Sequence, residues 1–336
     1  MALLVDIGFI LAATAAIWKG SDWLEAASER LAAYYGLPDV VQGAIIVAVG
    51  SSFPELATVV VAAIGGSMPL GVGAIVGSAI FNVLVIPAVA GIATDEDVDS
   101  NRTLVYKEAQ FYMLAVSVLL ITFALAVIYY PGPATLSGTV TRSLAVIPLA
   151  LYGLYIFIQY QDTADYEQDS DEAEGIDVRR QWLFLLSGLL VILLAVERLV
   201  HSVEEIGLAF GVEEFLLGVT ILAAATSLPD TLVSVRAARD GRGVTSLANV
   251  LGSNTFDLLV AIPVGVLIIG TWTVDFAMAV PMFGVLTGAT ILLFTALRTD
   301  LALSTLESYV LLGAYLVFVT WVVAETASII TGILPS

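Results

Sequence analysis

Long apolar stretches follow one another along the entire chain, interrupted by short polar segments. Each stretch has about 20 residues or more, which is enough for a helix to cross roughly 30 Å of hydrocarbon. None shows the period-two alternation of a barrel strand. The pattern predicts an all-α membrane protein with about ten transmembrane helices, and their recurrence excludes a lone signal peptide as the explanation. The predicted spans are 3–33, 38–64, 69–92, 103–129, 139–160, 181–210, 214–238, 243–270, 273–297 and 303–331.

Composition narrows the chemistry that such a bundle can perform. The chain has 336 residues, of which 59% are hydrophobic and 13% charged, and its mean hydropathy of +0.97 excludes a soluble domain. There is no cysteine, and His201 is the single histidine. Disulfides, thiolate metal sites and histidine clusters for zinc are therefore excluded. Any bound metal must be held mainly by oxygen, which suits Ca2+, Mg2+, Na+ or K+.

The positive charges predict the orientation in the membrane. Nine of the basic residues fall at loops on one side of the predicted spans, and only Arg142 lies clearly on the other. By the positive-inside rule the richer side is cytoplasmic, so both termini face outward. Five spans precede the hydrophilic loop 161–180, so the second half enters the membrane inverted. The nine residues are Arg30, Arg102, Lys107, Arg179, Arg180, Arg236, Arg239, Arg242 and Arg298.

The net charge of −19 is concentrated in part in two acidic loops, 95–99 and 162–177. The second loop is predicted to be a solvated cytoplasmic connection. A regulatory Ca2+ site there is the alternative, but the loop lacks the glycine-bearing spacing of an EF-hand. The predicted organisation is a five-helix repeat over 1–160, the acidic loop over 161–180, and a second, inverted five-helix repeat over 181–336.

A shift of 175 positions aligns the chain with itself, and the match includes its polar residues. GLPDVVQGAIIVAVGSSFPELATVVVAAI aligns with GVEEFLLGVTILAAATSLPDTLVSVRAAR, and VGSAIFNVL with LGSNTFDLL, without a gap. Inverted repeats of this kind are typical of secondary transporters whose site lies at the repeat interface near the midplane. The matched pairs include Ser52 with Ser227, Pro54 with Pro229, Glu55 with Asp230, Ser78 with Ser253, and Asn82 with Asp257.

The two matched acids, Glu55 and Asp230, each follow a proline inside an apolar span. An ionisable group at a helix centre costs about 2.5–3.5 kcal/mol on insertion scales, so each acid needs a partner or an ion. The alternative to ion binding is a buried hydrogen bond or a pair with a basic residue, for which Lys19 and Arg198 are the candidates at comparable depth.

The prolines free backbone carbonyls next to these acids. A proline cannot donate to the carbonyl four residues earlier, so carbonyls near Gly50 and Ser51, and near Ala225 and Thr226, become available to a hard cation. The alternative is a plain helix kink whose carbonyls are satisfied by neighbouring hydroxyls.

Serines share helix faces with the polar motif residues. Ser52 and Ser227 stand three positions before the two acids, and Ser78 and Ser253 stand four positions before Asn82 and Asp257. The four serines are predicted to be ligands. Gly73, Gly77 and Gly252 are predicted to allow close helix packing.

The motifs GSSFPE with GSAIFN, and ATSLPD with GSNTFD, resemble the cation/calcium exchanger superfamily and its sodium/calcium exchanger branches. The resemblance implies Ca2+ coordination by Glu55 and Asp230 with the carbonyls of Ser51 and Thr226. It also implies that the first and sixth spans slide together. The Na+ sites that it implies combine those acids with Ser52, Ser78, Asn82, Ser227, Ser253 and Asp257.

The function expected from this resemblance is exchange of Na+ for Ca2+ by alternating access in the plasma membrane, with no enzyme activity and no cofactor. The corresponding motif of proton-coupled relatives resembles GNAxE. The serine-proline-acid motif found here therefore favours Na+ as the coupling ion. The second repeat, with Asp230 and GSNTFD, is similar to potassium-dependent exchangers, so Ca2+/H+ and K+-dependent exchange stay open. The expected partners are the transported ions and the bilayer, with no nucleic acid and no obligatory protein partner.

Two other classes are alternatives. A cation channel could use acidic residues, but an internally duplicated inverted chain favours a carrier. An intramembrane aspartyl protease could use Asp230 and Asp257, but it would leave Glu55 and the repeat unexplained.

Overall fold

The structure is a computed structural model that describes residues 2–35, 48–94, 96–102, 104–163 and 176–327. Its elements are almost entirely helical, as predicted. In this part of the chain, eight helices are long and apolar enough to span a membrane, and a ninth span is made by a bent pair of helices. The first part of the predicted span 38–64 lies outside the described residues, so the count of ten spans stays a prediction.

Seven of the spans contain a long, uninterrupted α-helix, and their bounds lie close to those predicted. Their ends follow ordinary capping rules: α8 begins after Asp177, whose side chain accepts a hydrogen bond from the Arg180 N–H, and α15 begins with a capping box of Ser304 and Glu307. The helices are α1 (Ala2–Tyr34), α5 (Met68–Ile92), α6 (Ala109–Tyr129), α7 (Arg142–Thr163), α8 (Val178–Phe210), α14 (Phe276–Arg298) and α15 (Thr305–Thr326).

The remaining helices are segmented, and the segments concentrate at the motif positions. In the first half, α3 (Ala48–Ser51) and α4 (Phe53–Gly65) meet at Ser52, and η2 (Leu104–Glu108), a π-helix, leads into α6. The second half contains α9 (Glu214–Leu217), η4 (Gly218–Leu222), α10 (Ala223–Thr226), α11 (Leu228–Arg239), α12 (Gly243–Phe256), η5 (Asp257–Ala261) and α13 (Ile262–Ile269).

Two short antiparallel ladders, which the sequence analysis did not predict, join the ends of spans. β1 (Val98–Asp99) pairs with β4 (Ala302–Leu303), and β2 (Ser137–Thr141) pairs with β3 (Thr271–Asp275). The first residues of the predicted spans 139–160, 273–297 and 303–331 are therefore strand and not helix. Both ladders link the first half of the chain to the second.

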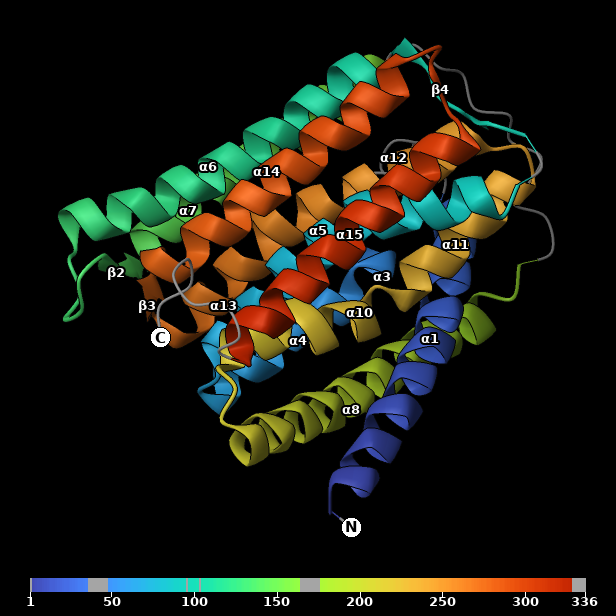
Figure 1. Cartoon of the computed structure of the whole chain (residues 1–336). Helices are drawn as coiled ribbons and strands as arrows, with labels where there is room; N and C mark the ends of the chain where they lie inside the picture. The colour runs from blue at the N-terminus through green and yellow to red at the C-terminus, as the bar shows by residue number, and fades with distance from the viewer. Residues whose placement is uncertain (1, 36–47, 95, 103, 164–175, 328–336) are drawn as a thin grey trace.

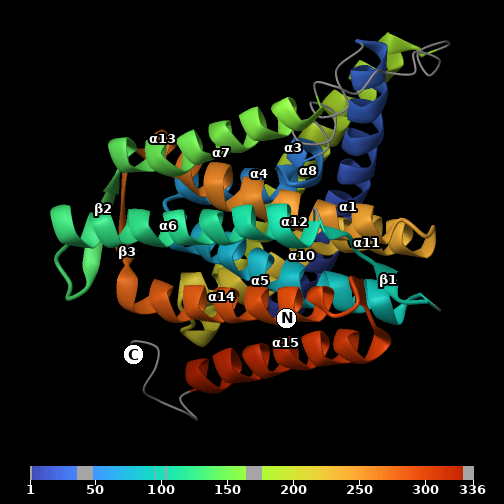
Figure 2. The same cartoon turned by 90° about the horizontal axis from the view of Figure 1, so that it is seen from above.

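The helices form a central group and a separate pair. α5 is the most buried long helix and contacts α4, α10, α11, α12, α14 and α15. Figures 1 and 2 show α6, α14 and α7 lying along one side of this group, while α1 and α8 cross each other on the opposite side. Close packing of the pair depends on glycines: a Cβ on Gly188 would lie 2.7 Å from the Gly20 carbonyl oxygen.

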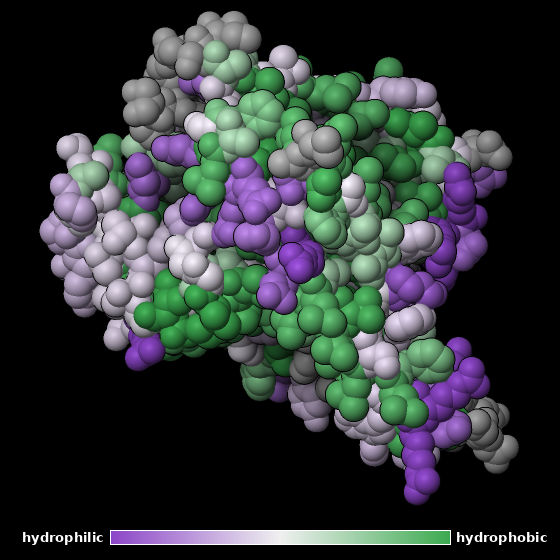
Figure 3. Space-filling model, turned by 90° about the horizontal axis from the view of Figure 1, so that it is seen from below, coloured by the Kyte–Doolittle hydropathy of each residue, from purple (hydrophilic) through white to green (hydrophobic). Residues whose placement is uncertain are grey.

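The surface has the character expected of a protein in a bilayer. Broad hydrophobic areas cover the face shown in Figure 3, with smaller polar groups between them and at the edges. Exposed large apolar residues are found along most of the long helices, including Leu11, Leu183, Leu190, Ile128 and Val317. A soluble protein does not leave so many such side chains in water. The chain is an integral membrane protein.

Candidate cation site

Two broken helices place the matched acids. The helix breaks at Ser52 and at Ser227, and the second break turns the chain by 45°. Pro54 and Pro229 occupy the first turn of α4 and α11, where their missing N–H groups are tolerated. Glu55 and Asp230 follow in that same first turn, so each carboxylate stands at the positive end of a half-helix.

All ten predicted ligand residues are buried. Glu55 and Asp230 are each 1% exposed and Asp257 is fully buried. None lies in the hydrophilic loops, although most of the net charge does. The ten residues are Ser51, Ser52, Glu55, Ser78, Asn82, Thr226, Ser227, Asp230, Ser253 and Asp257.

Hydrogen bonds join the two halves at this point in matched pairs. The Ser52 hydroxyl lies 2.6 Å from that of Ser253, and the Ser227 hydroxyl lies 2.7 Å from that of Ser78. The 175-residue shift converts the first pair into the second. The two contacts are therefore equivalent under the repeat, as expected where inverted repeats meet.

The serine pairs lead directly to one of the acids. Ser253 Oγ donates to Asp230 Oδ2 over 2.8 Å, and Ser51 Oγ lies 3.4 Å from Ser253 Oγ. The Ser52 side chain also approaches Asp257. The structure thus brings the predicted serines together with two of the three acids.

A second polar network adjoins this one and contains residues that the sequence analysis missed. Asn82 Nδ2 donates to Asn254 Oδ1 over 2.9 Å, and Asn254 Nδ2 lies within hydrogen-bonding distance of the Ala79 carbonyl and the Tyr112 hydroxyl. Asn254 is fully buried and lies inside the GSNTFD motif. The polarity of Asn254 within an apolar span could have identified it. The 175-residue shift pairs Asn254 with Ala79, which is apolar, so the comparison of the two repeats did not.

Six oxygen atoms of this cluster have no hydrogen-bond partner among the described residues. They are both carboxylate oxygens of Glu55, both of Asp257, Oδ1 of Asp230 and Oδ1 of Asn82. The Thr226 hydroxyl approaches Glu55 but donates instead to the carbonyls of Leu222 and Ala223. Buried polar atoms are normally satisfied, so a concentration of unpaired oxygens makes these residues candidate ligands of a cation.

Neither basic residue considered as a partner for the acids serves that role. Lys19 forms an exposed ion pair with Asp22, with 2.7 Å between Nζ and Oδ2. The Arg198 guanidinium carbon lies over the ring of Phe9, 5.8 Å from the ring centre. The ion-pair alternative therefore loses its two candidates, whereas the hydrogen-bond alternative holds in part for Asp230, which accepts from Ser253.

The three acids do not all surround one point. Within the described residues, no three Asp, Glu or His side chains converge closely enough to hold a single ion. Glu55, Asp230 and Asp257 nevertheless lie within electrostatic range of one another. An ion at this site would be held by at most two carboxylates together with hydroxyl, amide and carbonyl oxygens.

Asp257 begins a π-helical segment, η5, between α12 and α13. Such single-turn widenings are frequent at functional sites, because they shift one side chain relative to the regular helix. Another π-helical segment, η4, lies just before α10, which ends at the break at Ser227. The sequence pattern gave no indication of either.

The packing role predicted for the motif glycines is confirmed for two of them. A Cβ on Gly73 would lie 2.2 Å from the Phe215 carbonyl oxygen, and one on Gly77 would lie 2.2 Å from that of Val219. These glycines let α5 lie directly against the backbone of the second half. The prediction is wrong for Gly252, because a Cβ there would meet nothing within 4 Å.

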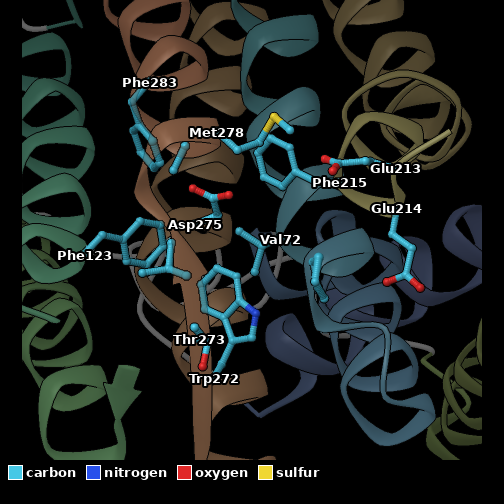
Figure 4. Close-up of a pocket in the computed structure, with 13 residues that line it drawn as sticks. Val72, Phe123, Glu213, Glu214, Phe215, Trp272, Thr273, Asp275, Met278 and Phe283 are labelled. Atoms are coloured by element: carbon cyan, nitrogen blue, oxygen red, sulfur yellow. The ribbon is translucent and has the colours of Figure 1, made fainter. Parts of the chain in front are cut away.

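A cavity of about 320 Å³ lies elsewhere and contains none of the predicted ligands. Figure 4 shows Phe123, Phe215 and Trp272 among its walls, with Glu213 and Asp275 among the carboxylates that line it. Burial and the nearby Asp275 raise the pKa of Glu213. The cavity is mostly apolar, so it does not provide a cation site comparable to the buried oxygens.

Comparison with known proteins agrees with this geometry. The model of the family described as sodium/calcium exchanger protein matches residues 5–161 and 180–324, which include every predicted ligand. The chain belongs to the sodium/calcium exchanger family. Its members are transporters and not enzymes, and the antiporter function expected from the sequence motifs follows from this membership.

Individual relatives cover the chain to different extents. An uncharacterized membrane protein of Methanocaldococcus jannaschii, MJ0091, is 30% identical over 263 residues, covering 78% of this chain and 82% of that protein. Human sodium/potassium/calcium exchanger 1 is 38% identical over 94 residues, covering 26% of this chain and 9% of that protein.

The fold also matches a solved structure. The sodium-calcium exchanger NCX_Mj, soaked with 10 mM Na+ and zero Ca2+, superposes with a TM-score of 0.64 at 23% identity. The alignment covers 95% of this chain and 99% of that one. The similarity therefore extends over both halves of the fold.

Proposed function

We propose that the chain exchanges Na+ for Ca2+, and that the buried oxygens between its two halves bind the ions. The observation that carries the proposal is the set of six unpartnered oxygens, contributed by Glu55, Asn82, Asp230 and Asp257. Ca2+ takes six to eight oxygen ligands at flexible geometry, whereas Mg2+ requires a strict octahedron. A site of carboxylates, amides and hydroxyls on four helix segments suits Ca2+ better.

Glu55 and Asp230 are the proposed Ca2+ ligands, with the carbonyls of Ser51 and Thr226 at the two helix breaks. Both acids stand in equivalent first turns and come from opposite halves of the chain. Two carboxylates neutralise the two charges of Ca2+, which agrees with the finding that no three acids converge on one point. Carbonyls at broken helices are the ligands that transporters use for hard cations.

Na+ is proposed to bind at sites made of the same acids together with the serine hydroxyls. Ser52 and Ser253, and Ser78 and Ser227, already form pairs beside the acids, so their oxygens can turn toward an ion. Asn82 and Asp257 complete these sets. Hydroxyl, amide and carboxylate oxygens are ordinary ligands of hard monovalent cations.

Charge balance explains why such a carrier would exchange ions. If ionised and empty, three midplane carboxylates would cost on the order of 8–10 kcal/mol, using insertion values additively. Bound Ca2+ leaves one negative charge, and two or three Na+ leave one or none. Only a loaded carrier reorients readily, which couples the movement of one ion to that of the other.

The crossed pair α1 and α8 is the proposed moving unit. The two helices pack extensively on each other, and together they contribute most of a hydrophobic cluster distinct from the main core. Their outer faces carry many exposed apolar residues, as needed for contact with lipid. A rigid pair of this kind can slide along the central helices and open the site to either side in turn.

The proposed location is the plasma membrane, with both termini outside. Basic residues at one end of the bundle support this orientation: Arg239 donates to the Ala93 carbonyl and Arg298 lies over Tyr106. Arg142 lies at the opposite end, where it donates to the Leu267 carbonyl. The arginine-rich end is the proposed cytoplasmic end.

Ca2+ uptake into liposomes of purified protein tests the proposal. Separate preparations are preloaded with Na+, with K+ or with a pH gradient alone, and radioactive Ca2+ is added outside. We expect uptake only when an outward Na+ gradient is present. Uptake driven by the pH gradient alone would make H+ the coupling ion and contradict the proposal, and flux without any counter-ion would indicate a channel.

Replacing Asp257 with Asn tests whether a further cation or proton balances the remaining charge. With Ca2+ bound by Glu55 and Asp230, Asp257 holds the third negative charge and is fully buried. We expect Asp257→Asn to reduce any dependence of Ca2+ flux on K+ and on pH. Flux measured at several K+ concentrations and pH values checks this, and an unchanged dependence on both would exclude Asp257 as the balancing site.

A further inference from the structure

One face of α1 carries three oxygen-bearing side chains along its length. Ser21, Glu25 and Ser28 are spaced four and three residues apart, so they lie along one side of the helix. Ser21 is 3% exposed and Ser28 is 7% exposed, whereas Glu25 is only partly buried. The Ser21 hydroxyl has no hydrogen-bond partner among the described residues. A buried hydroxyl without a partner, one turn from a carboxylate, is a candidate ligand for a polar group or an ion.

This face lies against the segments that hold the buried acids. A Cβ on Gly50 would lie 3.9 Å from the Glu25 Cα and 3.9 Å from the Ser28 hydroxyl oxygen. Gly50 belongs to α3, which ends at Ser51, and α1 also contacts α10 and α11. Glu25 and Ser28 therefore lie beside α3, next to the helix break at Ser52 where proposed ligands are found.

The charges around Glu25 place it between the buried site and the protein surface. Its nearest charged neighbours are two acids of the same helix, Glu29 and Asp22, followed by Arg236, which is exposed near the end of α11. Its carboxylate also lies within electrostatic range of Asp230, which is buried at the start of α11. The structure describes no ion pair between Glu25 and Arg236. The carboxylate is therefore not neutralised by a fixed partner, although it lies within a membrane-spanning helix.

We infer that Ser21, Glu25 and Ser28 form an accessory site for a hard metal cation, through which ions enter the buried site from its arginine-rich side. Glu25 supplies the charge and the two serines supply hydroxyl oxygens. One carboxylate with two hydroxyls binds Na+ or Ca2+ weakly, which suits an ion in transit. The inference rests on the proposed function, because it assigns the approach to that site.

Charged residues of both signs surround this approach to the buried site. Arg236, Arg239 and Arg242 lie in or near the turn between α11 and α12, where Arg242 pairs with Asp240. Arg30 and Glu29 are exposed on α1 itself. A carboxylate placed past these surface charges raises the local cation concentration, as charged groups along a channel or cleft do.

Glu25→Gln tests the inference, because it removes the charge and preserves the shape. Asp240→Cys, at an exposed position in a chain without cysteine, lets an impermeant maleimide report which end of the protein faces outward in liposomes. Ca2+ and Na+ dependence of exchange is measured from each side in preparations enriched in either orientation. Glu25→Asp retains the charge, and Glu29→Gln removes an exposed carboxylate from the same helix one turn away.

We expect Glu25→Gln to raise the half-saturating Ca2+ concentration about 5-fold from the arginine-rich side only, and to do so less in high salt because screening weakens the attraction. Glu25→Asp and Glu29→Gln are expected to stay within about 2-fold of the unmodified protein. Equal shifts on both sides, or no shift on either, would overturn the inference. Absence of exchange in the unmodified protein would instead contradict the proposed function.

Discussion

Glu55→Gln is expected to lower the apparent affinity for Ca2+ by about 100-fold or more, equivalent to about 2.8 kcal/mol. The substitution keeps the size of the side chain but replaces one of the two carboxylates proposed to bind Ca2+. Glu55 is 1% exposed and neither of its oxygens has a hydrogen-bond partner among the described residues. Ca2+ affinity depends strongly on the number of charged ligands, so the neutral amide cannot substitute. Na+-driven Ca2+ uptake into liposomes provides the measurement.

Thermal unfolding distinguishes an ion ligand from a structural carboxylate. Without ions, Glu55→Gln should raise the unfolding temperature, because it removes a buried charge that has no partner. Ca2+ should stabilise the unmodified protein but not the variant, since a ligand stabilises only the state that binds it. Glu205→Gln, an exposed carboxylate on α8, is the control and should retain the Ca2+ effect. A variant that melts earlier and still responds to Ca2+ would exclude Glu55 as a ligand.

Sequence alone predicted most of the architecture because the bilayer restricts the choices. Backbone groups in hydrocarbon must be satisfied within a helix, so apolar length determines where each span lies. The bounds predicted for α1, α5 and α8 differ from the observed ones by at most a few residues. The first residues of three spans were wrong because β2 pairs with β3 and β1 with β4 across the halves. Strand pairing between distant segments leaves no local signal in such short stretches.

The site was predictable to the extent that the repeat exposed it. Matching positions identified the acids and the serines, and the structure places the serine pairs in contact. Polar residues without a polar counterpart in the other repeat could not be identified in this way. Asn254 and Tyr112 join the polar network through contacts that have no counterpart under the 175-residue shift. Glu25 likewise has no acidic counterpart, because Val200 stands at the matching position.

This asymmetry matters for transport. An inverted repeat supplies two equivalent half-sites, but exchange in a cell requires different behaviour on the two sides of the membrane. The buried serine pairs match between the two repeats. Glu25 and the Asn254 network have no such match, and the longer side chain of Glu55 corresponds to the shorter one of Asp230. We expect ion binding that is the same from either side of the membrane to depend on the residues that match between the repeats. Differences between the two sides should then follow from residues that occur in one half only.

Gly77→Ala is the second substitution with a large expected effect, and Gly252→Ala is its matched control. The shift of 175 positions relates the two glycines, and each precedes the serine of its motif. A Cβ on Gly77 would lie 2.2 Å from the Val219 carbonyl oxygen and 2.5 Å from the Val219 Cα, so a backbone segment must move. A Cβ on Gly252 would meet nothing within 4 Å.

The two alanine variants should therefore differ in stability although their sequence contexts match. Overpacking typically costs about 1–3 kcal/mol, and we expect Gly77→Ala to reach the upper end because the contact is with backbone. Gly252→Ala should be neutral or stabilising by less than about 1 kcal/mol, since alanine has a higher helix propensity than glycine. Thermal unfolding of both purified variants gives the comparison. Equal stability would show that α5 does not need glycine to lie against the second half, and that the close contact between repeats is set elsewhere.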